Sequence, residues 1–493
     1  MARATRQFEI APKRAGNYSS DTCVYFVGMR EIAWQGRKPG VEMHCKTATE
    51  TREWNYEGWE DLVQEALAEW EECPVCLPPF QETFTAAEQA AREARLEEFL
   101  KSVEGDLRRP PRSKSGRNAL RERVTLGFER FAKAGLGLED EHLGLLLNGG
   151  FSAMGTQMAR GARRFDPSIS PADVFQATRN AWTAGGIQVL LGREMRLTPA
   201  IFAYSMLYPY TDNYLDDTGV PSEEKIKFSA RIRRRLSGEM IAPIREGEAT
   251  LWQLFELIEG QYCRADWPQV YASLLAIHQA QENSLRQRGS PPSVGGPDVL
   301  KLSFEKGGAS VLADGHLAAG ALSREEAEFV FAWGALLQLV DDLQDIRQDR
   351  REGALTIFTQ AAGRVPLDEL TTHTLSFGQK VMRRMDQMPI RCQALKEMIQ
   401  KSYVSLLVWS AGECGELYTR DYLAELETHS PFRFASVAKR RKQVAKLTGP
   451  LTRLFEAFLE DARDQAVFPL DQLSKDTSSE ARKLHEAALA GEL

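Results

Sequence analysis

Residues 329–349 read Phe-Val-Phe-Ala-Trp-Gly-Ala-Leu-Leu-Gln-Leu-Val-Asp-Asp-Leu-Gln-Asp-Ile-Arg-Gln-Asp. The first twelve are almost all apolar and are too few to span a bilayer, so they predict a buried helix. Residues four apart on an α-helix lie only about 40° apart around its axis, so Asp341, Asp345 and Asp349 share one face. Trp333 and Leu337 precede them at the same step. The face that should meet the core therefore turns acidic partway along the helix.

A second acidic cluster ends another apolar helical segment about 130 residues earlier. It reads Asp212-Asn213-Tyr214-Leu215-Asp216-Asp217, in which Asp212 and Asp216 share a face. Tyr204 and Tyr208 precede Asp212 at the same four-residue step. Either cluster alone is more typical of a solvated acidic helix face. Together they predict a metal site inside a helical bundle, because carboxylates crowded in a cleft repel one another unless cations hold them.

The overall composition is that of an ordinary globular protein. The chain has 493 residues, of which 43% are hydrophobic and 27% charged, and its length favours one large core with an appendage. A formal net charge of −7 argues against nucleic acid as an electrostatic partner. The basic runs at residues 231–235 and 439–442 are expected to be solvated helix faces. The alternative is that one of them borders an anionic-substrate site.

The cysteines and the N-terminus bear on the cellular compartment. Seven scattered cysteines, an odd number, do not indicate a disulfide framework and fit a reducing cytoplasm. Positive charge near the N-terminus is not followed by an apolar segment, so no signal peptide is expected. A cytoplasmic location is therefore predicted. Cys73 and Cys76, with His44 and Cys45 upstream, could ligate zinc, although one Cys-x-x-Cys pair is weak evidence.

Three regions are expected along the chain. Residues 1–115 form an N-terminal extension, irregular with β-prone pieces such as residues 23–27, then helical from Thr85 to about Glu104, ending in a linker rich in Pro, Arg and Ser. Residues 116–470 form an all-α domain, and residues 471–493 a polar tail. Helix starts are predicted at Ser170-Pro171, Thr198-Pro199 and Ser323.

These residues carry a resemblance to the class I isoprenoid synthase superfamily, which includes trans-prenyl diphosphate synthases, squalene/phytoene synthases and class I terpene synthases. Residues 334–345 resemble the Gln-x-x-Asp-Asp-x-x-Asp segment of prenyl synthases, and residues 346–353 are similar to the end of the phytoene-synthase motif. Asp212-x-x-x-Asp216-Asp217 resembles the squalene-synthase form. Lys306-Gly307-Gly308-Ala309-Ser310 lies where relatives have a small-residue helix kink beside the substrate. The resemblance covers about residues 140–420.

The resemblance implies a helical bundle with a central cavity and Mg²⁺, three ions in family members, held between the two motifs. The metal set that it implies comprises Asp212, Asp216, Asp217, Asp341, Asp342, Asp345 and Asp349. Of these, Asp212, Asp216, Asp341 and Asp345 are expected to be essential for catalysis. Asp217 and Asp342 point about 100° away from their neighbours, so they are the members most expected to lie behind the site or on the surface.

Substrate contacts follow from the same resemblance. The expected substrate-binding residues are Gln338, Lys306, Arg350, Arg351, Tyr208 and Trp333. Aromatic ring faces stabilise a carbocation, and the candidates for the cavity wall are Tyr204, Tyr208, Tyr210, Phe304, Trp333 and Trp409. Two or three of these six rings are expected to line the cavity, and the others to be ordinary core residues.

Departures from the family pattern separate its subclasses. Chain-elongating synthases carry Arg-Arg-Gly shortly after the first motif, whereas residues 218–224 here read Thr-Gly-Val-Pro-Ser-Glu-Glu. The predicted function is therefore Mg²⁺-dependent ionisation and cyclisation of a linear isoprenyl diphosphate with release of pyrophosphate. A squalene/phytoene-type head-to-head synthase and a non-catalytic prenyl-lipid binding protein are the alternatives. A homodimer is left open.

Overall fold

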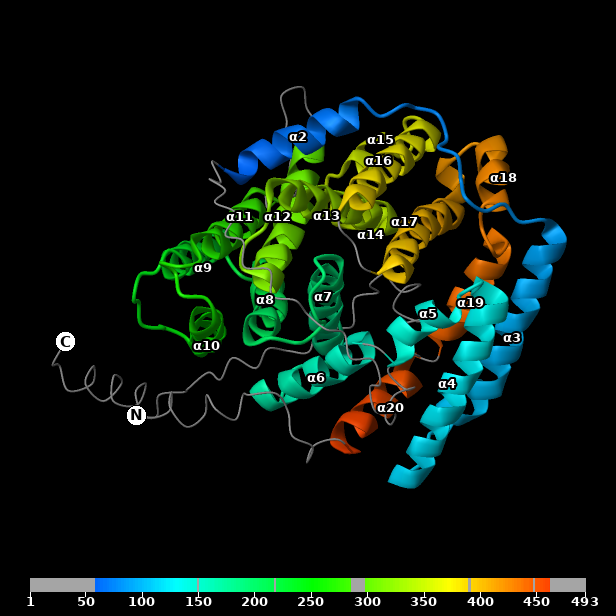
Figure 1. The fold of residues 1–493 in the computed structure, drawn as a ribbon, viewed down its shortest axis with the longest axis horizontal. Coiled ribbons are helices and arrows are strands. Elements are labelled where there is room, and N and C mark those ends of the chain that lie inside the picture. Colours follow the sequence, from blue (N-terminus) through cyan, green and yellow to red (C-terminus); the bar gives the residue numbers. More distant parts are fainter. Residues whose placement is uncertain are drawn as a thin grey trace.

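The computed structural model describes residues 58–148, 150–216, 219–284, 298–388, 392–446 and 448–461. Within these ranges the secondary structure is helical apart from an isolated bridge between Ala362 and Val365, which confirms the all-α class (Figure 1). The β-prone segment at residues 23–27 and the tail from residue 471 lie outside the described residues.

The helices follow one another in the order α2 (Trp59–Glu71), α3 (Ala86–Arg108), α4 (Lys114–Leu136), α5 (Asp140–Leu143), the π-helix η1 (Gly144–Asn148), α6 (Gly150–Phe165), α7 (Pro171–Leu190), α8 (Pro199–Asp216), α9 (Ser222–Leu236), α10 (Glu246–Gln261), α11 (Pro268–Ser284), α12 (Val299–Ala319), α13 (Arg324–Gln344), α14 (Ile346–Glu352), α15 (Ile357–Ala361), α16 (Asp368–Gln387), α17 (Gln393–Glu413), the 3₁₀ helix η3 (Gly415–Leu417), α18 (Arg420–Thr428), α19 (Phe434–Ala445) and α20 (Thr448–Asp461).

Side-chain caps set where several of these helices begin. The hydroxyl oxygens of Thr85, Ser170, Thr198 and Ser323 each accept a hydrogen bond from the backbone N–H three residues later. These bonds satisfy N–H groups that have no partner inside the first turn. The predicted starts of α7, α8 and α13 are confirmed, and α3 runs to Arg108, a little beyond its predicted end.

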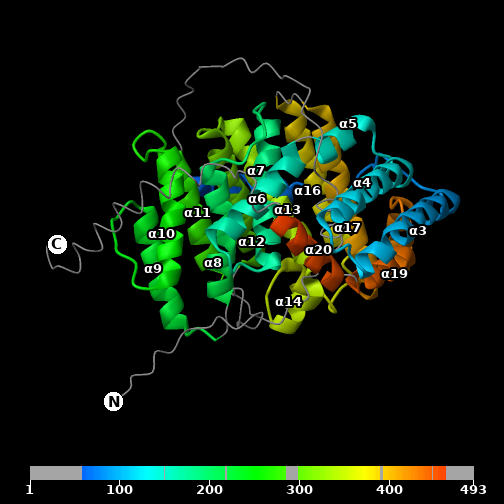
Figure 2. The ribbon, with the colours of Figure 1, turned by 90° about the horizontal axis from the view of Figure 1, so that it is seen from below.

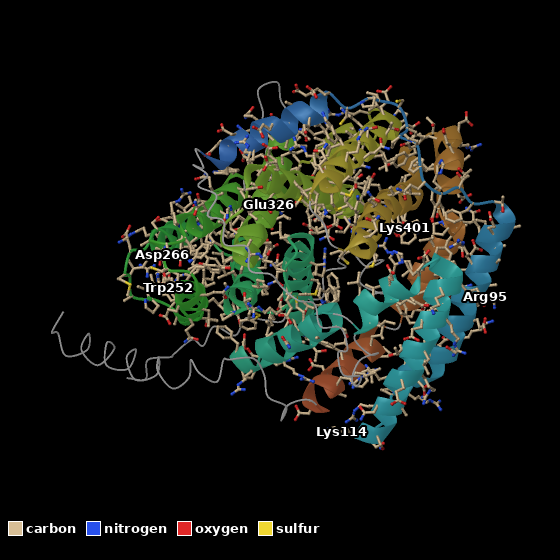
Figure 3. All side chains as sticks on the ribbon, in the orientation of Figure 1. Arg95, Lys114, Trp252, Asp266, Glu326 and Lys401 are labelled. Atoms are coloured by element: carbon tan, nitrogen blue, oxygen red, sulfur yellow. The ribbon has the colours of Figure 1, made fainter. Side chains whose placement is uncertain are left out.

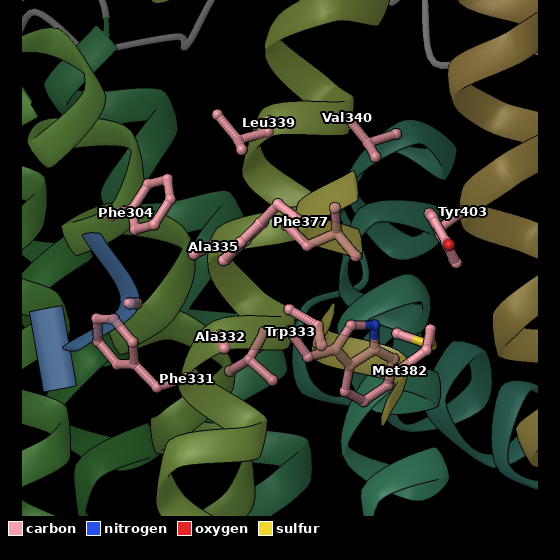
Figure 4. Close-up of a cluster of buried hydrophobic side chains, with 14 of the residues drawn as sticks. Phe304, Phe331, Ala332, Trp333, Ala335, Leu339, Val340, Phe377, Met382 and Tyr403 are labelled. Atoms are coloured by element: carbon pink, nitrogen blue, oxygen red, sulfur yellow. The ribbon is translucent and has the colours of Figure 1, made fainter. Parts of the chain in front are cut away.

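Helices α12 and α13 form the centre of the molecule. Helix α12 packs against α2, α7, α8, α11 and α13, and its residues from Leu302 to Ala319 are buried except Lys306 and Ser310. Side chains fill the space between the ribbons (Figure 3), and one buried cluster gathers aromatic and aliphatic groups from α12, α13, α16 and α17 (Figure 4).

Two glycines set the distance between α12 and α13. A Cβ atom added at Gly307 would lie 2.3 Å from the carbonyl oxygen of Gly334, and one added at Gly334 would lie 2.2 Å from the carbonyl oxygen of Gly307. The two backbones therefore touch, which only residues without a side chain allow. Helix α12 runs without a break through this segment, so the small residues expected at a kink serve the contact with α13.

The first described helix packs into the same core. The Trp70 ring of α2 contacts Phe304 of α12 and Phe377 of α16 at centroid distances of 6.0 and 5.6 Å. Glu69 of α2 accepts a hydrogen bond from Arg384 Nε at 2.8 Å. Part of the predicted N-terminal extension thus belongs to the central bundle.

Helices α3 and α4 form an antiparallel hairpin at one end of the molecule. Their apolar faces share a cluster with α20 and with residues before α19, in which Phe99 stacks on Phe131 at 5.7 Å. The segment predicted to be an interdomain linker is the turn of this hairpin, and the boundary predicted at residue 115 falls at its second arm.

Candidate active site

The second acidic motif lies where α13 gives way to α14. The N–H of Asp345 donates to the carbonyl oxygen of Asp341 at 2.9 Å, and the N–H of Asp349 donates to that of Asp345 at 2.9 Å. The four-residue step therefore continues through the turn between the helices. All three side chains are only partly buried, although most of α13 is buried. Solvent reaches this acidic face at the end of a core helix.

Asp342 lies behind the acidic face and is 5% exposed. Its Oδ2 accepts a hydrogen bond from Ser303 Oγ at 2.6 Å, and its Oδ1 accepts one from Gln338 Nε2 at 2.8 Å. Burial raises the pKa of Asp342 to about 6, against the effect of these two hydrogen bonds. Both carboxylate oxygens thus have protein partners, and the side chain ties α13 to α12.

The remaining carboxyl groups of the motif lie close together. Burial, followed by the charges of Asp342, Asp345 and Asp341, raises the pKa of Asp349 to about 8. The positive charge of Lys306 on α12 lowers the pKa of both Asp342 and Asp349, against the effect of burial. The lysine expected to bind substrate therefore faces the second motif from the neighbouring helix.

The register of α8 against α12 relates the first motif to the second. The Tyr208 hydroxyl bonds Ser310 Oγ, and the Tyr204 hydroxyl donates to the Ser310 carbonyl oxygen at 3.2 Å. One turn earlier on α8 and one turn later on α12, Nδ2 of Asn180 from α7 lies 3.1 Å from both Ser205 Oγ and Asp314 Oδ1. Residues with higher numbers on α8 therefore lie beside residues with lower numbers on α12, so the two helices run antiparallel.

Continued by one turn, this register brings the backbone of Asp212 level with Lys306. The acidic end of α8 therefore points to the end of the bundle that holds the second motif, and α8 and α14 both reach the lower edge of the molecule in Figure 2. The side chains of Asp212 and Asp216, and all of Asp217, lie outside the described part of the structure.

The other predicted substrate contacts lie away from the acidic face. Arg350 and Arg351 are exposed on α14, where Arg351 Nε donates to the Arg347 carbonyl oxygen at 3.2 Å. Trp333 is 7% exposed and stacks on Phe329 at 5.9 Å within the apolar cluster of Figure 4. The expected roles of these three residues stay predictions.

The six candidate wall aromatics separate into two groups. Tyr204 and Tyr208 face Ser310 on the stripe of α12 that continues from Lys306. The others pack elsewhere: Tyr210 donates to Asp166 at 2.8 Å, Phe304 packs against Trp70 and Phe377, Trp333 against Phe329, and Trp409 donates to Ser430 at 3.1 Å.

All six arginines of the two basic runs form ion pairs with glutamates. Those of residues 231–235 pair with Glu248, Glu282, Glu239 and Glu259. Arg440 and Arg441 pair with Glu97 and Glu413. These runs were expected to be solvated faces. Most of these ion pairs join different segments of the chain, because every glutamate except Glu239 comes from another helix.

The remaining candidate metal ligands do not gather in the described residues. Cys73 is buried, with its Sγ donating to the Glu69 carbonyl oxygen at 3.1 Å, while Cys76 is exposed. His44 and Cys45 lie outside the described residues. Across the ranges that the structure describes, no three His, Cys, Asp or Glu side chains form a group suited to a metal ion. These ranges include the side chains of Asp341, Asp345 and Asp349 but not those of Asp212 and Asp216.

Sequence reasoning missed three residues of this region: Ser303, Asn180 and Asp314. Asp314 could have been singled out from the sequence, because it follows Lys306 and Ser310 at the same four-residue step.

In the described part of the chain, no helix has the length and apolar character needed to cross a membrane. No protein-family model and no curated protein sequence matches this chain.

Proposed function

We propose that this chain is a Mg²⁺-dependent class I terpene synthase, which ionises and cyclises a linear isoprenyl diphosphate with release of pyrophosphate. The observation that carries the proposal is the partly buried acidic face of Asp341, Asp345 and Asp349 beside Lys306. The acidic end of α8 points to the same end of the bundle, as the antiparallel register requires. The sequence resemblance supports the same function.

The donor set fits Mg²⁺, which prefers carboxylate and water oxygens over nitrogen and sulfur. Asp341, Asp345 and Asp349 would hold it from α13 and α14, and Asp212 and Asp216 from α8. Bound there, Mg²⁺ would neutralise the charge that develops on the leaving pyrophosphate without any proton transfer.

The chain's own groups account for the rest of the proposed reaction. Lys306 would bind a phosphate oxygen as a compact positive charge. Asp342 holds α12 and α13 in register through Ser303 and Gln338. The rings of Tyr204 and Tyr208 would face the carbocation after the diphosphate has left, and apolar helices would keep water away from it.

The first experiment measures pyrophosphate release from farnesyl diphosphate and longer linear prenyl diphosphates with Mg²⁺, with products identified by mass spectrometry. Asp345→Ala should lower turnover by about 10²-fold or more, equivalent to about 2.7 kcal/mol of barrier. The matched control is Glu352→Ala, because Glu352 is an exposed carboxylate at the end of α14. Near-normal turnover in Asp345→Ala would remove the acidic face from the mechanism.

The second experiment separates an enzyme site from simple binding of a prenyl chain. Because the two motifs come from different helices, Mg²⁺ and pyrophosphate together should raise the melting temperature more than either alone. Ligand at about 100 times its dissociation constant would add about 2.7 kcal/mol to the free energy of unfolding. Asp212→Ala and Asp345→Ala should each abolish the shift. A non-catalytic prenyl-lipid binding protein would release no pyrophosphate from any diphosphate tested.

A further inference from the structure

One buried acid remains outside the proposed chemistry. Asp314 follows Lys306 and Ser310 at the same four-residue step, so the three share a face of α12. It lies two turns beyond Lys306, or about 12 Å along the helix axis. The side chain is 1% exposed. It therefore lies deep in the bundle, away from the acidic end.

Only one oxygen of the Asp314 carboxyl group has a hydrogen-bond partner among the described residues. Oδ1 accepts a hydrogen bond from Asn180 Nδ2 at 3.1 Å, whereas Oδ2 is buried and accepts none from them. A buried polar atom without a partner is unfavourable, so this oxygen is a place where a bound molecule would be stabilised. Burial raises the pKa of Asp314 well above its ordinary value.

Asn180 of α7 links Asp314 to a hydroxyl group on α8. Asn180 Nδ2 also lies 3.1 Å from Ser205 Oγ. Pro209 lies inside α8 and has no N–H, so it cannot donate to the carbonyl oxygen of Ser205 four residues earlier. Asn180 is only partly buried, as is Ser310 on the same face of α12. Solvent therefore reaches Asn180, which is bonded to Asp314, and Ser310, which lies one turn before it on α12.

A buried water molecule usually makes about three hydrogen bonds to polar groups that lack other partners. We propose that Asp314, Asn180 and Ser205 bind one water molecule at the inner end of the site, and that this water captures the carbocation, so that the product is an alcohol. The capture step rests on the proposed function. Lys306, Ser310 and Asp314 lie along one face of α12. The substrate would then lie along this face, with its diphosphate near Lys306 and its hydrocarbon end near the water at Asp314.

The step balances without any further reagent. Ionisation breaks the C–O bond to the diphosphate, and both electrons leave with pyrophosphate. A lone pair of the bound water forms the new C–O bond. One O–H bond of that water then breaks, and the proton goes to the solvent that reaches the partly buried Asn180. Asp314 orients the water and takes no part in the proton transfer.

The test runs the reaction in water labelled with oxygen-18 and compares two substitutions at Asp314. The wild type should give an alcohol that carries the label. Asp314→Leu removes the water site and should give mainly hydrocarbon, with pyrophosphate release within about threefold of wild type, or about 0.65 kcal/mol. Asp314→Asn keeps a neutral donor and acceptor of the same shape and should keep the labelled alcohol. The matched control is Thr178→Val, which removes a buried hydroxyl that donates to the Val174 carbonyl oxygen within α7.

The outcomes separate this inference from the proposed function. Hydrocarbon alone from the wild type, or labelled alcohol from Asp314→Leu, overturns carbocation capture while the synthase assignment stands. If Asp314→Leu does not fold, the wild type and Asp314→Asn still decide. A high-resolution crystal structure tests the water site even if no diphosphate reacts: density is expected about 2.5–3.0 Å from Asp314 Oδ2, and its absence overturns the site.

Discussion

Replacing Gly334 by alanine tests whether the contact between α12 and α13 holds the acidic face in position. The new Cβ would lie 2.2 Å from the Gly307 carbonyl oxygen and 2.9 Å from Val311 Cβ, whereas ordinary contact begins at 3.4 Å. To relieve this overlap, the backbones of α12 and α13 would have to move apart by about 1.2 Å, because neither close atom belongs to the end of a flexible side chain.

That separation also affects the hydrogen bond that crosses this interface. Ser303 Oγ lies 2.6 Å from Asp342 Oδ2, so a shift of about 1 Å takes the pair beyond hydrogen-bond distance. Overpacking costs about 1–3 kcal/mol and the lost bond about 0.5–1.5 kcal/mol, while alanine recovers about 1 kcal/mol of helix propensity. We expect Gly334→Ala to lower the free energy of unfolding by about 1–3 kcal/mol.

The assay is chemical denaturation of the full chain, followed by circular dichroism and by tryptophan fluorescence. The matched control is Gly105→Ala on α3, where an added Cβ would meet no atom within 4 Å. The control should be as stable as the wild type or more stable, by about 0.5–1 kcal/mol, because alanine favours the helix. If Gly334→Ala behaved like Gly105→Ala, the two helices would not be in backbone contact and the reasoning would fail.

Three further predictions concern other parts of the molecule. Isopentenyl diphosphate added with an allylic diphosphate should give no longer diphosphate by mass spectrometry; elongation would indicate a condensing enzyme. Trp70→Ala should lower the free energy of unfolding by about 3–5 kcal/mol, measured by denaturant titration, and an unchanged midpoint would contradict the docking of α2. Although burial opposes it, hydrogen bonds from His278 and Ser229 and the charges of His278 and Arg233 hold the pKa of Glu282 at about 2. Because the folded pKa lies below the ordinary 4.5, this stabilisation is present above pH 4.5 and is lost as the pH falls towards 2. Stability of Glu282→Gln should therefore vary less over that range, and an equal slope would contradict the assignment.

The sequence predicts those features that depend on residues close together in the chain. The caps at Ser170 and Ser323 and the acidic step from Asp341 to Asp349 follow from helix geometry alone, and the described structure contains them. The all-α class was also predicted from the sequence, and the described helices confirm it.

Contacts between distant residues could not be predicted in this way. Asp342 has a partner 39 residues earlier in Ser303, and the choice of that serine depends on where α12 crosses α13. The arginines of residues 231–235 gave no sign of their glutamate partners, because a run of like charge looks the same whether solvent or another helix faces it. Asp314 follows Lys306 and Ser310 at a four-residue step, but nothing near it in the sequence indicates that Asn180, 134 residues earlier, lies against it.

The docking of α2 has a consequence for how this protein emerges from the ribosome. Its partners Arg324 and Arg384 follow Glu65 and Glu69 by 259 and 315 residues. At about 5–20 residues per second, synthesis of that length takes about 15–60 s. Throughout this interval the apolar side of the helix, with Leu62 and Trp70, has no native surface to cover it. Although α2 is the first described helix in the chain, it is among the last to dock. Chaperones that bind short apolar segments should therefore associate with nascent chains at α2.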